Sequence, residues 1–366
     1  MVSAKTCLTG SVGSRHSGES FGDRFELPPD RAYNETCASI ASFQWSWRLL
    51  LATGDSRYAD LMERVLYNGF AAATSTEGDR FFYVNPLQRR GDHFAGDEPA
   101  RRRRWYSCAC CPPNIMRTFA SLEHYLAAVS GDILHLHHFT GAQVSTSLAG
   151  GILALDMVTD YPWSGTVTLR VTSAPIGECG LAIRVPGWSS NPRFLLNDAP
   201  VAATVQHGYL VIRRQWHPGD VVTCDFAAAP RLTYPSRRID ALRGTVAIER
   251  GPLVYCAEQA DQPARRDLED LALHPGELRD REATVPGVGA TILVEAAAAA
   301  LSPASVPGLP YRSERGEQPA GDRVTLTAIP YFQWDNRDGA PMRVWMPLAD
   351  AASQPPSSAQ PAEQTD

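Results

Sequence analysis

The segment Cys108-Ala-Cys-Cys-Pro-Pro-Asn114 holds three of the chain's eight cysteines. Apolar residues follow it at three- and four-residue steps, which predicts a helix that ends near Gly131. The two prolines suit the first turn of a helix, where the missing N–H costs nothing. We therefore expect Cys110 and Cys111 at a helix N-terminus, where the partial positive charge favours a thiolate over a thiol.

Two further apolar helices are predicted upstream, from Ala38 to Thr53 and from about Ser56 to Phe70. Gly54 ends the first of them, and the short link between the two predicts an αα-hairpin.

Glu35 and Cys37 precede the first of these helices, as Cys110 and Cys111 precede the later one. Both pairs are thus expected at helix starts, a geometry that could bring them to one cation. Zinc accepts cysteine sulfur and carboxylate oxygen, and soft thiolates select zinc over magnesium or calcium. The spacing alone leaves metal binding open against buried or redox-active thiols.

Residues 1–36 are expected to form a loop, which contains the carboxylate of Glu19. On spacing alone, Glu19 fits a solvated side chain. Tyr83 lies in the aromatic stretch from Asp79 to Leu87, predicted as a short strand or extended piece, and on this pattern it fits a core residue.

Short β-rich runs separated by Gly, Pro, Asn and Asp follow residue 131 and predict antiparallel sandwiches over 131–235 and 236–349. The first set of runs is Ile133–Phe139, Ala142–Leu148, Thr166–Thr172, Leu181–Val185, Gly208–Arg213 and Val221–Phe226. The second set is Thr245–Ile248, Leu253–Ala257, Ala290–Glu295, Val324–Ile329 and Met342–Pro347, with a polar connector from Ser302 to Gly321. The tail 350–366, rich in Ala, Ser, Pro and Gln, is expected to be disordered.

Composition narrows the function further. The net charge of −6 in 366 residues argues against a nucleic-acid surface, and the one basic run is Arg101 to Arg104. No apolar stretch approaches the roughly 20 residues of a membrane span, and the first residues lack the pattern of an export signal. Cysteines that cluster in one place and scatter elsewhere indicate a reducing compartment, so a cytoplasmic location is expected.

Four blocks of sequence resemble glycoside hydrolase family 127, the zinc-dependent β-L-arabinofuranosidases: Gly13–Gly22, Tyr33–Ala38, Asp79–Pro86 and Cys108–Asn114. Three later blocks resemble the C-terminal sandwiches of that family: Arg184–Trp188, Glu249–Tyr255 and Met342–Pro347. The resemblance extends over nearly the whole chain, up to Leu348.

The resemblance implies a role for each candidate residue. Cys110 matches the family's nucleophile, which is also a zinc ligand, and the remaining ligands match Glu35, Cys37 and Cys111. Glu19 matches the general acid/base, and Tyr83 matches a tyrosine that lines the sugar site.

The resemblance also implies the fold: a partial (α/α)6 barrel over residues 1–130, followed by the two sandwiches. Most barrel helices have no counterpart in this chain, and Gly10-Ser-Val-Gly13 stands where the family commonly has Gly-Gly-Ile-Gly. We therefore expect either a truncated copy or fragment, or a partner chain that supplies the missing helices.

The function implied is that of a retaining β-L-arabinofuranosidase acting on an arabinofuranoside or a related plant-derived oligosaccharide, with zinc as cofactor. Neither nucleic acid nor membrane is expected as a partner, and a homodimer is the candidate assembly. The alternative is a non-catalytic, zinc-stabilised β-sandwich remnant that binds carbohydrate. A third hypothesis is a thiol redox protein built on Cys110 and Cys111.

Overall fold

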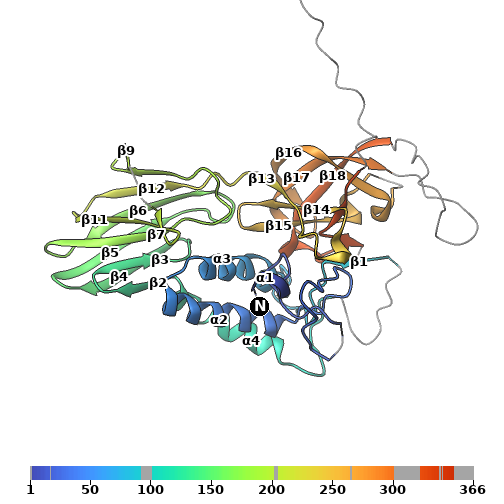
Figure 1. Ribbon diagram of the computed structural model, residues 1–366, viewed down its shortest axis with the longest axis horizontal. Helices are drawn as coiled ribbons and strands as arrows, with labels where there is room; N and C mark the ends of the chain where they lie inside the picture. Colours follow the sequence, from blue (N-terminus) through green and yellow to red (C-terminus); the bar gives the residue numbers. More distant parts are fainter. Residues whose placement is uncertain are drawn as a thin grey trace, which may run out of the picture.

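The computed structural model describes residues 2–16, 18–91, 101–201, 205–263, 266–300, 322–337, 339 and 341–349. The predicted connector 302–321 and the predicted tail 350–366 lie outside these residues. Figure 1 shows two strand-rich parts beside each other, with the helices α2, α3 and α4 running along one side of both. The chain is thus a multidomain protein with many strands and few helices, which agrees with the expectation of a helical part followed by strand-rich domains.

The described residues contain four α-helices, α1 Val2–Lys5, α2 Thr36–Thr53, α3 Arg57–Arg64 and α4 Cys111–Phe119. A π-helical turn, η1 Val65–Phe70, continues α3. Short 3-10 turns complete the set: η2 Ala71–Ala73, η3 Leu122–Tyr125, η4 Asp240–Leu242, η5 Gln259–Asp261, η6 Leu268–Asp270 and η7 Tyr331–Gln333. These few helices do not delineate a barrel.

The predicted αα-hairpin is confirmed as α2 and α3. Gly54 ends α2 with a φ of 68°, a left-handed conformation that glycine adopts without a steric penalty, and its N–H bonds the carbonyl of Leu50 at 2.8 Å. Buried residues of the hairpin, among them Phe43 and Met62, pack with Ile115 of α4 into one core.

The single helix predicted from the cysteine segment to Gly131 is wrong in its second half. The helix α4 ends at Phe119, and residues Ala127–Ser130 form the strand β2, which pairs antiparallel with β3 Ile133–Leu136. Pairing with a neighbouring strand outweighs the local helical pattern here. The stretch from Asp79 to Leu87 is extended and pairs through isolated bridges at Phe81.

The middle part is a sandwich of two sheets. One sheet has the order β10-β11-β7-β3-β2 and the other β4-β5-β6-β12-β8-β9. The strands not yet named are β4 Ala142–Leu148, β5 Gly151–Val158, β6 Thr166–Ser173, β7 Glu178–Arg184, β8 Arg193–Leu196, β9 Ala199–Pro200, β10 Val205–Gln206, β11 Tyr209–Gln215 and β12 Val221–Asp225. All pairs are antiparallel except β3 with β7, which is parallel.

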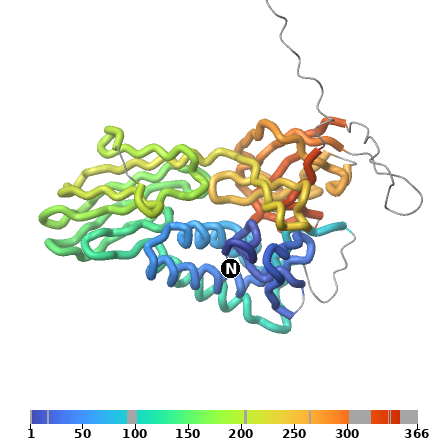
Figure 2. The backbone as a smooth tube through the Cα atoms, in the orientation of Figure 1, coloured from blue at the N-terminus to red at the C-terminus, as the bar shows by residue number. Residues whose placement is uncertain are grey.

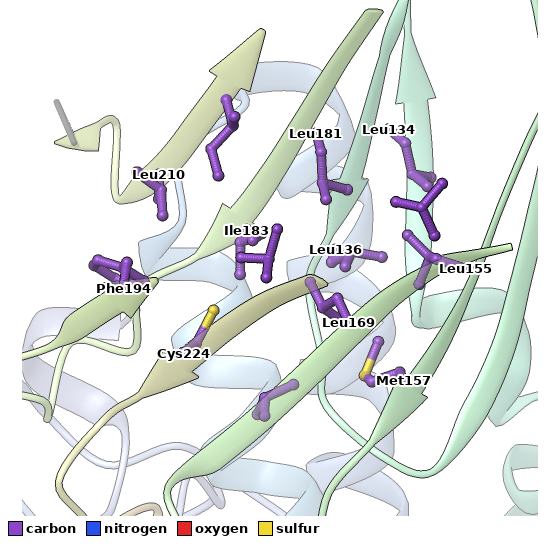
Figure 3. Packing of buried hydrophobic residues seen from close by; sticks show 14 of the residues in the cluster. Leu134, Leu136, Leu155, Met157, Leu169, Leu181, Ile183, Phe194, Leu210 and Cys224 are labelled. Carbon is purple, nitrogen blue, oxygen red and sulfur yellow. The ribbon is translucent and has the colours of Figure 1, made fainter. Parts of the chain in front are cut away.

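The core of this sandwich lies between its two sheets (Figure 3). Strand β6 shows why: Val167, Leu169 and Val171 are buried, whereas Thr166 and Arg170 are exposed. Alternate residues of a strand point to opposite faces, so one face of β6 is apolar and contacts the other sheet.

The C-terminal part is one branched sheet of nine strands, with the path β1-β19-β15-β18-β17-β16; β14 pairs with β15 of this path, and β13 and β20 pair with β14. Its strands are β1 Gln88–Arg89, β13 Pro230–Thr233, β14 Thr245–Arg250, β15 Leu253–Glu258, β16 Leu271–Val285, β17 Gly289–Ala300, β18 Asp322–Pro330, β19 Met342–Arg343 and β20 Met346–Pro347. The predicted runs fall on strands, while the long strand β16 had no predicted counterpart.

Strand β15 is buried on both faces. Leu253, Tyr255 and Ala257 belong to one apolar cluster, whereas Val254 and Cys256 belong to another. The second cluster also contains residues of the N-terminal segment, which Figure 2 shows beside the C-terminal sheet. That sheet therefore supports the loops that lead to α2 and α4.

Helix α3 joins the helical part to the middle sandwich through buried charges. Glu63, 2 % exposed, pairs with the fully buried guanidinium of Arg184 and accepts hydrogen bonds from Tyr161 Oη at 2.5 Å and Trp188 Nε1 at 3.0 Å. Asp60 Oδ1 holds the same guanidinium at 2.6 Å. The segment 184–188 is thus the attachment of the sandwich to α3.

The next turn of the same helix attaches the C-terminal sheet. Arg64 forms an ion pair with buried Glu249, and the Asn68 amide bonds the backbone of Pro252 at 3.0 Å and Val254 at 2.7 Å.

Among the described residues, no helix is long and apolar enough to cross a membrane.

Candidate metal centre and active site

The starts of two packed helices position the four predicted ligands. Glu35 is the residue before α2 and Cys37 lies in its first turn. Cys110 is the residue before α4 and Cys111 is its first residue. Because α2 and α4 share a core, their N-terminal ends meet and the four side chains converge.

The distances show a compact cluster. Cys111 Sγ lies 3.6 Å from Cys37 Sγ and 3.7 Å from Cys110 Sγ. Glu35 Oε1 lies 3.4 Å from Cys110 Sγ and 3.8 Å from Cys111 Sγ. All four ligand atoms are within 4.8 Å of one another. The cluster could therefore hold a metal ion.

Four of the six spacings between the ligand atoms fit a tetrahedral zinc ion. With Zn–S bonds of about 2.3 Å and a Zn–O bond of about 2.0 Å, a regular tetrahedron separates two sulfurs by about 3.8 Å and a sulfur from an oxygen by about 3.5 Å. The sulfur–sulfur and sulfur–oxygen distances given above are close to these values. Three sulfurs and one carboxylate are also a donor set that suits zinc.

Without a cation, the surroundings oppose ionisation of two of the three thiols. Burial raises the pKa of Cys110 to about 12. The hydrogen bond with Cys37, together with burial, raises the pKa of Cys111 far above its ordinary value. The predicted placement of both cysteines at a helix start is confirmed, and the preference of that position for a thiolate stays a prediction.

The other two ligands are shifted in opposite directions. The hydrogen bond with Cys111, helped by Asn114, lowers the pKa of Cys37 to about 7. Burial raises the pKa of the Glu35 carboxyl. Of the three thiols, that of Cys37 therefore ionises most readily, and a bound cation would favour ionisation of Cys110 and Cys111.

Tyr83 lies between the cluster and Glu19. Its hydroxyl donates to Glu19 Oε1 at 3.1 Å and lies 3.4 Å from Cys110 Sγ and 4.0 Å from Cys108 Sγ. Burial raises the pKa of the Tyr83 phenol, which keeps it a hydrogen-bond donor. Glu19 itself is exposed, in a left-handed conformation with a φ of 48°.

Two residues near the site have no role in the sequence analysis. Tyr106 packs edge-on against Tyr83, and its hydroxyl donates to the carbonyls of Phe81 at 3.0 Å and Arg101 at 2.9 Å. The Asn114 amide donates to Cys37 Sγ at 2.8 Å. Asn114 belongs to the cysteine segment, but nothing in the pattern indicates that it reaches a cysteine 77 residues away.

Comparison with known proteins assigns every part of this architecture. Three family models match in succession: the GH127 catalytic domain of β-L-arabinofuranosidases at residues 1–124, the GH127 middle domain at 133–228, and the glycoside hydrolase family 127 C-terminal domain at 230–347. Domains of this type define a glycoside hydrolase architecture. The chain belongs to glycoside hydrolase family 127.

Individual relatives agree with this assignment. A non-reducing end β-L-arabinofuranosidase of Bifidobacterium longum subsp. longum is 32% identical over 371 residues, which cover 94% of this chain and 54% of the relative. The crystal structure of a GH127 β-L-arabinofuranosidase from Geobacillus stearothermophilus T6 superposes with a TM-score of 0.87 and 35% identity, over 95% of this chain and 55% of that one. Another GH127 β-arabinofuranosidase gives a TM-score of 0.83 and 33% identity, over 97% and 55%. The chain spans about half the length of these relatives.

Proposed function

We propose that this chain carries the active-site core of a retaining β-L-arabinofuranosidase in which zinc binds Glu35, Cys37, Cys110 and Cys111. Cys110 is the nucleophile and Glu19 the general acid/base in this proposal. The observation that carries it is the convergence of three sulfurs and one carboxylate oxygen within 4.8 Å of one another, with Tyr83 joining this cluster to Glu19. The identity of the sugar in this proposal, β-L-arabinofuranose, is taken from the names of the relatives.

The reaction proceeds in two displacements. The sulfur of Cys110 attacks the anomeric carbon while Glu19 gives its proton to the departing oxygen. Glu19, now ionised, takes a proton from the water that breaks the carbon–sulfur bond, and the configuration is retained. Bound zinc supplies the positive charge that keeps the Cys110 sulfur ionised, since burial otherwise raises its pKa to about 12.

The separation of the two reacting groups favours retention. Tyr83 Oη lies 3.1 Å from Glu19 Oε1 and 3.4 Å from Cys110 Sγ, so these two atoms are at most about 6.5 Å apart. Retaining glycosidases place their two groups about 5–5.5 Å apart, whereas inverting enzymes need about 6.5–9.5 Å to admit a water. Tyr83 would line the sugar site between them.

The wider expectations belong to the same proposal. The substrate is an arabinofuranoside or a related plant-derived oligosaccharide, and residues 1–130 are a share of an (α/α)6 barrel. A cytoplasmic location and a homodimer also remain predictions. The second candidate function is a zinc-stabilised carbohydrate-binding protein without turnover. Two observations favour it: Glu19 is exposed, and the four residues of the metal cluster do not include Glu19.

Hydrolysis of an aryl β-L-arabinofuranoside tests the proposal. The chain is assayed alone and after co-expression with the part of the Geobacillus relative that it does not cover, and turnover is expected in the second case. Glu19→Gln and Cys110→Ser should abolish turnover, whereas the control Cys108→Ser should not, because Cys108 is exposed and lies outside the cluster. Turnover that survives the first two substitutions, or zinc and sugar binding with no turnover in either preparation, would remove the enzymatic assignment.

A further inference from the structure

The three sulfurs of the cluster are not equivalent. Cys111 is fully buried and contacts the other two sulfurs and Glu35. Cys110 is partly exposed and faces the Tyr83 hydroxyl. Cys37 accepts a hydrogen bond from the side-chain amide of Asn114 at 2.8 Å. This amide is the feature that the proposed reaction does not use.

The backbone of α4 places this amide firmly. The Asn114 N–H bonds the carbonyl of Cys110 at 3.4 Å, and Thr118 Oγ1 donates to the Asn114 carbonyl at 2.7 Å. The side chain therefore leaves the first turn of the helix that also carries Cys110 and Cys111, and it reaches Cys37 on the neighbouring helix α2. One side chain thus ties the two ligand-bearing helix starts together.

An amide N–H can only donate, so it is satisfied when Cys37 presents a sulfur lone pair. Residues that hydrogen-bond a metal ligand orient it and tune the electron density it gives to the ion. A donated hydrogen bond withdraws density from Cys37 and makes this sulfur a poorer nucleophile. The Cys110 sulfur, which faces the sugar-side hydroxyl of Tyr83, receives no amide from Asn114.

We infer that Asn114 is a positioning residue of the metal centre: its amide holds Cys37 as a purely structural ligand and leaves Cys110 as the reactive sulfur. This inference rests on the proposed zinc site. It gives different roles to cysteine side chains that are chemically identical: Cys37 is a structural ligand, and Cys110 is the reactive sulfur. Asn114 acts through Cys37 and touches neither the sugar nor the reacting atoms.

The test compares Asn114→Ala and Asn114→Leu with the matched control Thr118→Val. Alanine and the nearly isosteric leucine remove the amide and suit a helix, so α4 should form in both variants. Thr118→Val removes a hydroxyl that bonds the Asn114 carbonyl, one turn further along the helix, and keeps the amide. Circular dichroism checks folding before either measurement.

Zinc affinity is measured by competition with a chromophoric chelator, and the sulfur-to-metal charge-transfer bands are recorded after loading with Co²⁺. Both Asn114 variants should bind zinc about 10- to 100-fold more weakly. Their charge-transfer bands should move to lower energy, because a sulfur freed from a hydrogen bond gives up its electrons more easily. Thr118→Val should match the unsubstituted chain in both measurements.

The outcomes separate this inference from the proposed function. An unsubstituted chain that binds no zinc would overturn the proposed metal site itself. Zinc binding by the unsubstituted chain, with affinities within twofold and unchanged bands in both Asn114 variants, would overturn only the role of Asn114. Equal shifts in the Asn114 variants and in Thr118→Val would show a general effect of α4 and would also overturn it.

Discussion

The zinc affinity of this chain should rise steeply with pH, because zinc binds thiolates and the cluster stores protons on its thiols. Burial raises the pKa of Cys110 to about 12, and the hydrogen bond with Cys37 raises that of Cys111 further. Both therefore carry a proton throughout the range from pH 6 to pH 8. Cys37, with a pKa of about 7, is mostly ionised at pH 8 and mostly protonated at pH 6.

The magnitude follows from this proton count. Each proton that must leave reduces the apparent binding constant tenfold per unit fall in pH, so zinc releases about two protons near pH 8 and about three near pH 6. The apparent affinity should fall about 200-fold from pH 8 to pH 7 and about 500-fold from pH 7 to pH 6. The raised pKa of Glu35 adds to the loss at the acidic end.

Competition with a chelator of known pH dependence measures these affinities, and calorimetry in two buffers of different ionisation enthalpy counts the protons directly. Cys110→Ser removes one stored proton, so its count near pH 8 should drop to about one. A release of fewer than one proton by the unsubstituted chain at pH 8 would refute the reasoning. It would mean that Cys110 and Cys111 are already ionised or do not bind the metal.

Three further predictions concern the metal and the stability of the fold. Elemental analysis should find one zinc per chain, lost in Cys111→Ser and kept in Cys108→Ser; retention by the first variant would exclude Cys111 as a ligand. Glu63→Gln removes the negative charge that pairs with the buried Arg184 guanidinium and accepts a hydrogen bond from Tyr161. It should lower the free energy of unfolding by about 3 kcal/mol in a urea titration, and a loss below 1 kcal/mol would contradict this. Leu169→Ala, in the sandwich core, should cost about 2–5 kcal/mol, whereas Ile152→Ala, 51% exposed on a neighbouring strand, should change thermal unfolding little; equal effects would contradict the packing argument.

Much of the fold follows from local patterns. The apolar periodicity of 38–53 and 56–70 and the glycine between them predict the α2–α3 hairpin, and most strands of the sandwich follow from short β-rich runs between turn residues. The segment Ala127–Ser130 and the strands β5 and β16 were missed, since their strand character depends on pairing with neighbouring strands: β3 for Ala127–Ser130, β4 and β6 for β5, and β17 for β16. Hydrogen bonding to a distant neighbour leaves no periodic signal in the segment itself.

The amino-acid sequence by itself determined which side chains are available to the site: a carboxylate and a thiol before one helix, and two thiols before another. It could not determine that Cys37 and Cys111 lie 3.6 Å apart, because that distance depends on how α2 and α4 pack. Nor could it determine their protonation. Burial, which only the tertiary structure creates, raises the pKa of Cys110 to about 12, so a nearby cation would be needed to favour its thiolate.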